Sequence, residues 1–148
     1  MIAVLQRARD ARVDIDGTAS GTIDFGLVIL LGVFEDDTEQ DADYLADKTA
    51  NLRIFNDDDE KMNLSVQDVD GEALVISQFT LCADTRKGRR PSYIRAANPD
   101  KATELYEYFI GRLQKTGLPV HSGEFGAMMD VHLVNEGPVT IILDSKNR

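Results

Sequence analysis

The side chains of this chain that could act as nucleophiles gather near Cys82. Ser77, Thr80 and Cys82 stand in or just after the apolar segment 73–81, whose composition predicts a buried strand with polar groups in its second half. No histidine lies nearby in the sequence, so a Ser–His or Cys–His arrangement would need a partner from elsewhere. A strand end without a base can still offer backbone N–H groups to an oxyanion, each lowering the barrier by about 3 to 4 kcal/mol.

The pair Gly137-Pro138 interrupts a second apolar run, residues 131–143. A proline removes a ladder donor and a glycine weakens a strand, so this run predicts two strands that meet at a Gly-Pro joint. The peptide bond before a proline adopts the cis form at a cost of roughly 0.5 to 1 kcal/mol, and the sequence does not fix the isomer. Taken alone, the pair is typical of a turn between strands.

Metal and cofactor motifs are absent from the sequence. His121 and His132 are eleven residues apart, and neither a Cys-x-x-Cys nor a His-Glu-x-x-His pattern occurs. Residues 87–90, Lys-Gly-Arg-Arg, have neither the spacing nor the strand-to-helix context of a phosphate-binding loop. We therefore expect no metal and no nucleotide cofactor.

Length and cysteine content bound the class of protein. The 148 residues fit one domain, 1–148, that can bury a core without disulfides, and the single cysteine cannot form an internal one. The first residues lack the layout of a signal peptide, and the apolar stretch 26–34 is far shorter than the ~20 residues of a membrane helix. We expect a soluble, cytoplasmic protein without a membrane partner.

The charge of the chain is unevenly distributed. The net charge of −10 argues against DNA or another nucleic acid as a partner, since phosphate binding draws on a basic surface. Residues 35–72 carry a local charge of −11, however, whereas residues 84–95 carry +4. On charge alone this basic segment is typical of a solvated turn beside an acidic face that aids solubility.

Hydrophobic periodicity predicts strands at both ends of the chain and two helices between them. Residues 2–9 and 11–16 alternate, and Asp16-Gly17 offers a turn before Ile23, which predicts an opening hairpin followed by a strand over 27–33. The remaining expected elements are a helix over 38–54 capped by Thr38, the strand 73–81, a helix from Asn98-Pro99-Asp100 to Gly117, and strands over 120–122, 127–135 and 139–143. This order predicts an α+β fold whose largely antiparallel or mixed sheet curls into a barrel-like core with two main helices.

Two separated motifs carry a resemblance to a known family. Residues 77–80, Ser-Gln-Phe-Thr, and residues 135–140, Asn-Glu-Gly-Pro-Val-Thr, resemble the paired signature of the D-aminoacyl-tRNA deacylases. The resemblance extends over the whole chain through residues 3–7, 51–55, 85–92 and 125–129. It implies a homodimeric esterase that removes D-amino acids, and the achiral glycine, from the acceptor end of mischarged tRNA.

The resemblance also implies roles for individual residues. A cis Gly137-Pro138 pair would enter the partner subunit's site, hold the substrate's α-amino group with its carbonyls and exclude an L side chain. Arg7 would hold this pair in place, and Asn135 belongs to the same motif. The pocket would be formed by Ser77, Gln78, Phe79 and Thr80, with a backbone N–H of Phe79 or Thr80 on the carbonyl oxygen, and its walls by Phe125 and Met129. The acceptor end would be bound by Arg86, Lys87, Arg89 and Arg90.

The sequence leaves open both the chemical mechanism and the class of function. Thr80 could be the nucleophile, or the 2′-hydroxyl of the terminal adenosine could assist cleavage while the protein provides orientation and an oxyanion hole. The second mechanism explains why no protein base is visible. The chain could also be a module that binds aminoacylated tRNA ends without hydrolysis, or a structural dimer in which Gly137-Pro138 is only a strand joint.

Overall fold

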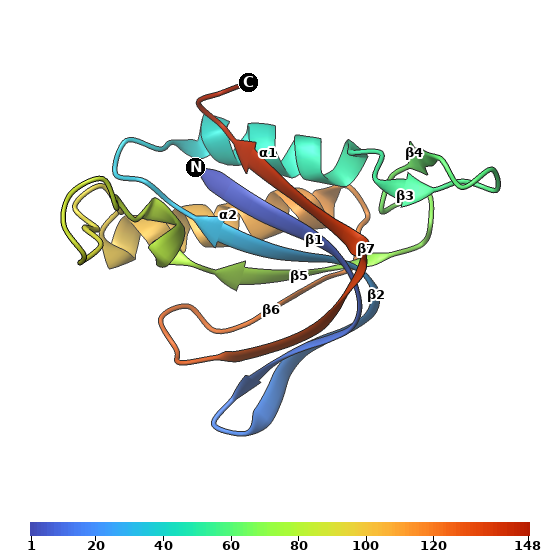
Figure 1. The fold of residues 1–148 in the computed structure, drawn as a ribbon, viewed down its shortest axis with the longest axis horizontal. Helices are drawn as coiled ribbons and strands as arrows, with labels where there is room; N and C mark the ends of the chain where they lie inside the picture. The colour runs from blue at the N-terminus through green and yellow to red at the C-terminus, as the bar shows by residue number, and fades with distance from the viewer.

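A long antiparallel hairpin opens the chain and forms the centre of its sheet (Figure 1). The computed structural model describes residues 1–148, in which β1 (Ile2–Ile15) pairs with β2 (Thr18–Gly32) around the turn Asp16-Gly17. Both turn residues have positive φ angles, 50° and 77°, as a type I′ hairpin requires. The predicted turn is confirmed. The separately expected strand segments merge, because pairing continues past Asp10.

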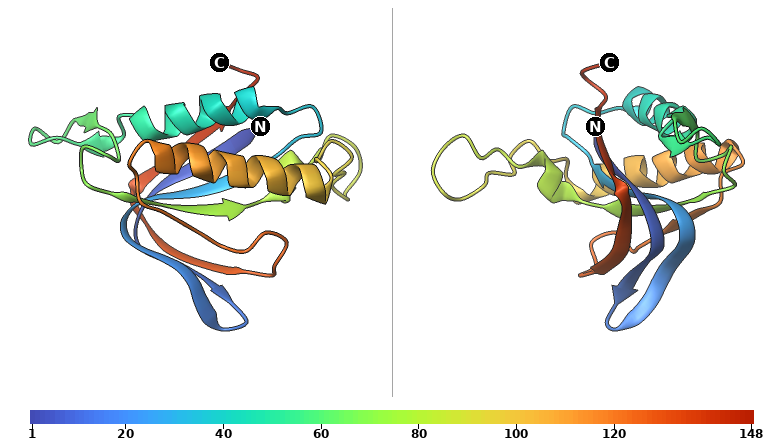
Figure 2. Two further views of the ribbon diagram at one scale, coloured as in Figure 1. Left: turned by 180° about the vertical axis from the view of Figure 1, so that it is seen from behind. Right: turned by 45° about the vertical axis from the view of Figure 1, so that its right-hand side comes forward.

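The main sheet is mixed and has the strand order β6-β5-β2-β1-β7. The strand β5 (Glu72–Ser77) lies parallel to β2, and β6 (Val120–Ser122) lies parallel to β5, whereas β7 (Asp130–Asp144) is antiparallel to β1. Two helices, α1 (Glu39–Asn51) and α2 (Pro99–Lys115), cover one face (Figures 1 and 2). The predicted α+β class is confirmed. The sheet curls but does not close, since β6 and β7 remain edge strands.

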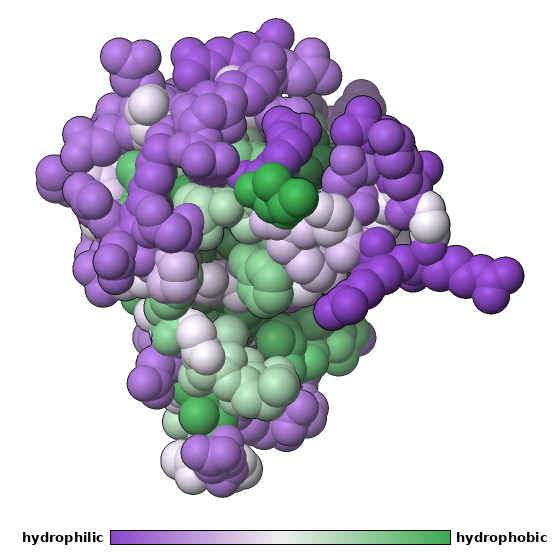
Figure 3. Space-filling model, turned by 90° about the vertical axis from the view of Figure 1, so that its left-hand side faces the viewer, coloured by the Kyte–Doolittle hydropathy of each residue, from purple (hydrophilic) through white to green (hydrophobic).

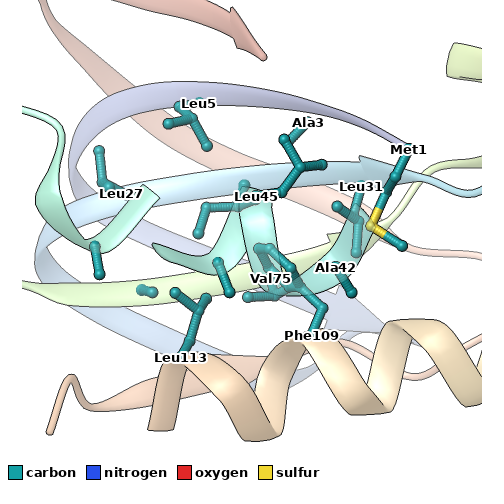
Figure 4. Close-up of a cluster of buried hydrophobic side chains, with 14 of the residues drawn as sticks. Met1, Ala3, Leu5, Leu27, Leu31, Ala42, Leu45, Val75, Phe109 and Leu113 are labelled. Carbon is teal, nitrogen blue, oxygen red and sulfur yellow. The ribbon is translucent and has the colours of Figure 1, made fainter. Parts of the chain in front are cut away.

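Alternating residues of the strands fill a hydrophobic cluster on each face of the sheet. On the helix-covered face, residues such as Leu27 and Val75 pack against Leu45 of α1 and Phe109 of α2 (Figure 4). On the other face, a smaller cluster formed by β1, β2 and β5 includes Leu74, with the partly buried Met129 packed against it. The period of two therefore directs alternate buried residues of these strands to opposite faces of the sheet.

Both helices begin at the predicted capping residues. The N-cap of α1 is Thr38, whose backbone N–H donates to the Asp41 carboxylate at 2.9 Å. The N-cap of α2 is Asn98, whose side chain accepts from the Lys101 N–H at 3.0 Å, with Pro99 at the first helical position. Neither helix is both long and apolar enough to cross a membrane.

Three expectations about the strands need correction. The strand expected over 73–81 ends at Ser77, and Phe79–Cys82 form the 3₁₀ helix η1 instead. No strand was expected between the helix over 38–54 and the strand over 73–81, yet β3 (Phe55–Asn56) and β4 (Met62–Leu64) form a short hairpin there. The two expected strands around Gly137-Pro138 are one strand, β7, whose pairing with β1 is interrupted between Asn135 and Thr140.

Candidate functional site

A cavity of about 600 Å³ lies at the carboxyl end of β5. The end of β5, the start of α2 and the β6–β7 connection enclose it. Figure 3 faces this end of the molecule, and there apolar side chains gather between strongly hydrophilic ones. The cavity is lined by Ile76, Ser77, Gln78, Phe79, Ala97, Pro99, Ala102, Phe125, Gly126, Ala127, Met128, Met129 and Val131.

The structure brings together five residues that the sequence placed in one pocket. Ser77, Gln78 and Phe79 come from the end of β5, and Phe125 and Met129 come from the β6–β7 connection almost 50 positions later. Thr80 is exposed beside them. The walls contributed by α2 and by residues 126–128 were not predicted, because their small or apolar side chains carry no chemical signature of a site.

The side chains of Gln78 and Thr80 are linked by a hydrogen bond. Gln78 Nε2 donates to Thr80 Oγ1 at 2.5 Å, so the threonine oxygen acts as an acceptor. A hydroxyl becomes a nucleophile when a base accepts its proton, and neither a histidine nor a carboxylate bonds to this one. The geometry therefore suits Thr80 to orienting a neighbour or donating a hydrogen bond rather than to attack.

The start of η1 offers backbone donors next to the cavity. The first hydrogen bond of this helix runs from the Leu81 N–H to the Gln78 carbonyl at 3.2 Å, so the N–H groups of Phe79 and Thr80 precede it and have no partner within the helix. Two adjacent N–H groups at a helix start can stabilise a negative oxygen. This arrangement suits an oxyanion hole.

The cavity walls contain no titratable side chain. The nearest thiol, Cys82, is buried, and burial raises its pKa to about 11, with the charge of Asp37 acting in the same direction. Its Sγ atom lies 3.4 Å from the Val33 carbonyl. Cys82 is therefore a protonated structural residue at neutral pH, and the cavity offers dipoles and shape rather than a titratable group.

The Gly-Pro pair lies on a bulge of β7. Residues 136–139 of β7 stand opposite Arg7 alone, between the pairs Ala8–Asn135 and Gln6–Thr140. The Gly137–Pro138 peptide bond is cis, as the resemblance implied. The Asn135 side chain closes the base of the bulge, because Nδ2 donates to the carbonyls of Arg7 and Val139, each at 3.0 Å.

Arg7 supports the bulge from below. Its side chain is buried, its Nη1 atom donates to the Ile54 carbonyl at 2.9 Å and to Asn56 Oδ1 at 3.3 Å, and its Nε atom lies 3.3 Å from Glu136 Oε2. The resemblance implied a place for Arg7 beside the Gly-Pro pair, whereas Glu136 and Asn56 were not predicted as its partners. For Glu136 the sequence held a signal, because an acidic residue directly before Gly137 could pair with a buried arginine.

The structure does not bring the two motifs together within one chain. Ser77 pairs with Leu31, and Leu31 pairs with Ala3 of β1, four positions from Arg7 at the bulge. With about 4.8 Å between strands and about 3.3 Å per residue, three strand spacings and four residues separate the bulge from Ser77 by on the order of 20 Å. Gly137 therefore does not reach the cavity of its own chain.

The basic loop, residues 84–92, projects from the end of the sheet that carries the cavity (Figure 2). Backbone hydrogen bonds between Asp84 and Ser92, at 2.8 and 2.9 Å, close its base. Arg86 donates to the Asp84 carboxylate at 2.9 and 2.6 Å, which holds the pKa of Asp84 well below its usual range. The side chains of Lys87, Arg89 and Arg90 are exposed and make no ion pair, so three of the four predicted cations are free.

The histidines are engaged singly with carboxylates. His121 Nε2 lies 3.0 Å from Glu72, and His132 Nε2 lies 3.1 Å from Asp14. No group of three or more His, Cys, Asp or Glu side chains is arranged to hold a metal ion. The acidic composition of the chain therefore forms no visible metal centre.

Comparison with known proteins gives consistent likenesses along the whole chain. A family model described as D-Tyr-tRNA(Tyr) deacylase matches residues 4–144. Proteins named D-aminoacyl-tRNA deacylase from Bacillus thuringiensis (strain Al Hakam) and Bacillus cytotoxicus are each 57% identical over 146 residues, covering 99% of this chain and 100% of theirs.

Solved structures give the same picture of the fold. A structure described as c-Myc DNA Unwinding Element Binding Protein is 38% identical, with a TM-score of 0.91 over 97% of this chain and 98% of its own. A structure titled as a probable eukaryotic D-amino acid tRNA deacylase is 17% identical, with a TM-score of 0.78 over 96% and 98% of the two chains. The second likeness concerns the fold alone.

Proposed function

The chain belongs to the D-Tyr-tRNA(Tyr) deacylase family, and from this premise we infer that it hydrolyses the ester bond of D-aminoacyl-tRNA, releasing the D-amino acid and free tRNA. Full-length identity of 57% to proteins named for this activity carries the inference. The reaction is a proofreading step of translation, and we propose that it takes place in the cytoplasm, where its substrate is used.

We propose that the cavity at the end of β5 receives the aminoacylated adenosine. The ester carbonyl would lie at the start of η1, where the N–H of Phe79 or Thr80 stabilises the oxyanion, while Phe125 and Met129 form apolar walls. Water adds to the carbonyl carbon, the bond from that carbon to the ribose oxygen breaks, and the departing oxygen takes up the proton that the water loses. The 2′-hydroxyl of the adenosine assists this proton transfer. The absence of titratable groups from the cavity walls supports this assignment over a protein base.

We propose that the protein acts as a homodimer in which each cavity is completed by the Gly-Pro bulge of the partner. The separation of about 20 Å between Ser77 and the bulge in one chain supports a second copy as the source of Gly137 and Pro138. Both residues are exposed and so are free to enter a partner's site. Their carbonyls would hold the α-amino group and leave no room for an L side chain.

A site that rejects substrates by excluding an L side chain cannot reject glycine. A glycyl ester has no side chain to clash with the bulge, so glycyl-tRNA should also be hydrolysed. The basic loop would bind the acceptor end, which explains how a chain of net charge −10 binds tRNA: only its terminal nucleotides meet the protein.

A deacylation assay that compares D-tyrosyl-tRNA, L-tyrosyl-tRNA and glycyl-tRNA tests this function. We expect rapid hydrolysis of the D and glycyl esters and little hydrolysis of the L ester. Equal rates on the D and L esters would remove chiral selection. Tight binding of D-tyrosyl-tRNA without hydrolysis would instead favour a non-catalytic module for aminoacylated ends.

A further inference from the structure

An exposed aromatic pair lies at the edge of the cavity. The ring of Phe79 packs against the ring of Tyr93, with 5.1 Å between their centroids and 60° between their planes. The two residues are nonetheless 57% and 37% exposed, and the adjacent Ile94 is 85% exposed. Large apolar side chains exposed together at the rim of a site are typical of a surface that meets a ligand.

The aromatic pair is continuous with free positive charge. Tyr93 follows Ser92, the residue that closes the basic loop, so the rings stand at the base of the loop that carries Lys87, Arg89 and Arg90. These three cations have no protein partner, while Arg86 is already neutralised by Asp84. Aromatic rings beside unpaired cations are the combination with which proteins bind single-stranded nucleic acid, where bases stack and phosphates pair.

We propose that Phe79, Tyr93 and Ile94 form a stacking shelf for the unpaired nucleotides that precede the terminal adenosine, with their phosphates bound by Lys87, Arg89 and Arg90. This inference rests on the proposed function, which places the terminal adenosine in the cavity. The RNA chain that precedes the adenosine would then leave the cavity past Phe79. This residue both lines the cavity and contacts Tyr93, so it connects the cavity with the shelf. The adjacent free cations favour RNA as the occupant over an apolar protein surface.

Kinetics on two substrates test the shelf. D-tyrosyl-tRNA carries the preceding nucleotides, whereas D-tyrosyl-adenosine lacks them. We expect Tyr93→Ser to raise KM for D-tyrosyl-tRNA roughly 5- to 150-fold, the range for losing one base stack, with less than a twofold effect on D-tyrosyl-adenosine. Tyr93→Phe, which keeps the ring and removes the hydroxyl, should match the unmodified protein on both substrates.

Salt dependence tests the phosphate contacts. For D-tyrosyl-tRNA, log(kcat/KM) should fall linearly with the logarithm of the salt concentration. The slope should be less steep by about 0.7 in Arg89→Gln, the change expected when one contact to a single-strand phosphate is lost. Lys115→Gln is the matched control, because Lys115 is an exposed cation in the last turn of α2, at the end of that helix away from the cavity. An unchanged slope in Arg89→Gln would overturn its part in the shelf.

The remaining outcomes separate the two proposals. If Tyr93→Ser raises KM equally for both substrates, or for neither, the shelf is overturned while the proposed function stays intact. A shift of Tyr93→Ser to a smaller species in sedimentation would also overturn it, since the rings would then cover a second copy of the chain. If the unmodified protein hydrolyses neither substrate, the proposed function fails and the shelf with it.

Discussion

The Nε atom of Arg7 lies 3.3 Å from Oε2 of Glu136, the residue immediately before Gly137. Arg7 is 7% exposed, and its guanidinium also donates to the Ile54 carbonyl and to Asn56. The position of the bulge is therefore tied to the segment that follows α1, through one buried cation. A group that must present its carbonyls to a substrate benefits from such fixed support.

Glu136→Gln should weaken catalysis more than folding. The amide keeps the size of the side chain but loses the ionic attraction to Arg7, so the bulge loses one restraint. A misplacement of about 1 Å can cost up to about 100-fold in rate, and we expect kcat/KM for D-tyrosyl-tRNA to fall by about tenfold or more. The matched control is Glu104→Gln, an exposed acid of α2 without an ion pair. Equal activities of the two variants would contradict a positioning role.

Gly137→Ala should damage both stability and activity. Gly137 has φ +122°, and an added Cβ would lie 2.8 Å from Val139 Cγ2 and 3.2 Å from Arg7 Nη2. The backbone cost alone is about 1 to 3 kcal/mol. Gly117→Ala controls for it, since Gly117 has φ +92° with nothing near its Cβ position. Urea unfolding should show that Gly137→Ala lowers the free energy of unfolding more than Gly117→Ala does. Equal decreases in the two variants would argue against the clash.

Thr80→Val should retain substantial deacylation. The variant keeps the shape and the backbone N–H of Thr80 but loses the oxygen that accepts from Gln78. Loss of one neutral hydrogen bond, worth about 1 kcal/mol, predicts a single-turnover rate about fivefold lower. Thr103→Val, in the first turn of α2, is the control for loss of a threonine hydroxyl. A decrease of several orders of magnitude with binding intact would make the Thr80 hydroxyl the nucleophile.

Two inactive variants should complement each other if the site is shared between copies. Ala102→Trp fills the cavity and Gly137→Ala distorts the bulge, so each alone should be inactive. A mixed dimer has one site built from an intact cavity and an intact bulge. Mixing equal amounts and allowing exchange should restore about a quarter of the activity. A mixture that stays inactive although native mass spectrometry shows mixed dimers would exclude a cross-subunit site.

Asp41→Asn should destabilise the protein more at neutral pH than in acid. Burial opposes ionisation of Asp41, yet the Thr38 N–H and Lys146 prevail and lower its pKa. A carboxyl with a lowered folded-state pKa contributes its full stability above its unfolded pKa of about 3.9, and this contribution declines as the pH falls from there through the folded-state pKa. Urea unfolding should show a loss of about 1 to 2 kcal/mol at pH 7 that shrinks toward pH 3. Asp47→Asn, on the exposed side of α1, should stay within about 0.5 kcal/mol at both pH values. A difference between Asp41→Asn and the unmodified protein that is as large at pH 3 as at pH 7 would contradict this account.

Local signals in the sequence predicted the helices and failed at one strand end. Asn98-Pro99 and Thr38 define the helix starts because a cap depends only on its immediate neighbours. The segment Phe79–Cys82 is as apolar as the strand before it, and nothing local distinguishes a 3₁₀ turn from a continuing strand.

Non-local features of the site lay beyond the sequence pattern. The residues of the cavity motif are consecutive, so Ser77, Gln78 and Phe79 could be placed together in advance. The distance between this motif and Gly137 depends on the register of four strands, which hydrophobic alternation does not specify. The contacts of Asn56 and Glu136 with Arg7 depend on the same register.

The bulge of β7 also bears on how this scaffold can diversify. Because β1 pairs with β7 on both sides of residues 136–139, the ladder is fixed independently of what lies between its two halves. Changes confined to the exposed part of the bulge leave the pairs Ala8–Asn135 and Gln6–Thr140, and with them the register, in place, whereas Val139 is buried in the main core and is not free to vary. The strands that build the fold are thus separate from the bulge that is proposed to set selectivity. Related chains can change their substrate preference at this bulge while they keep the same fold.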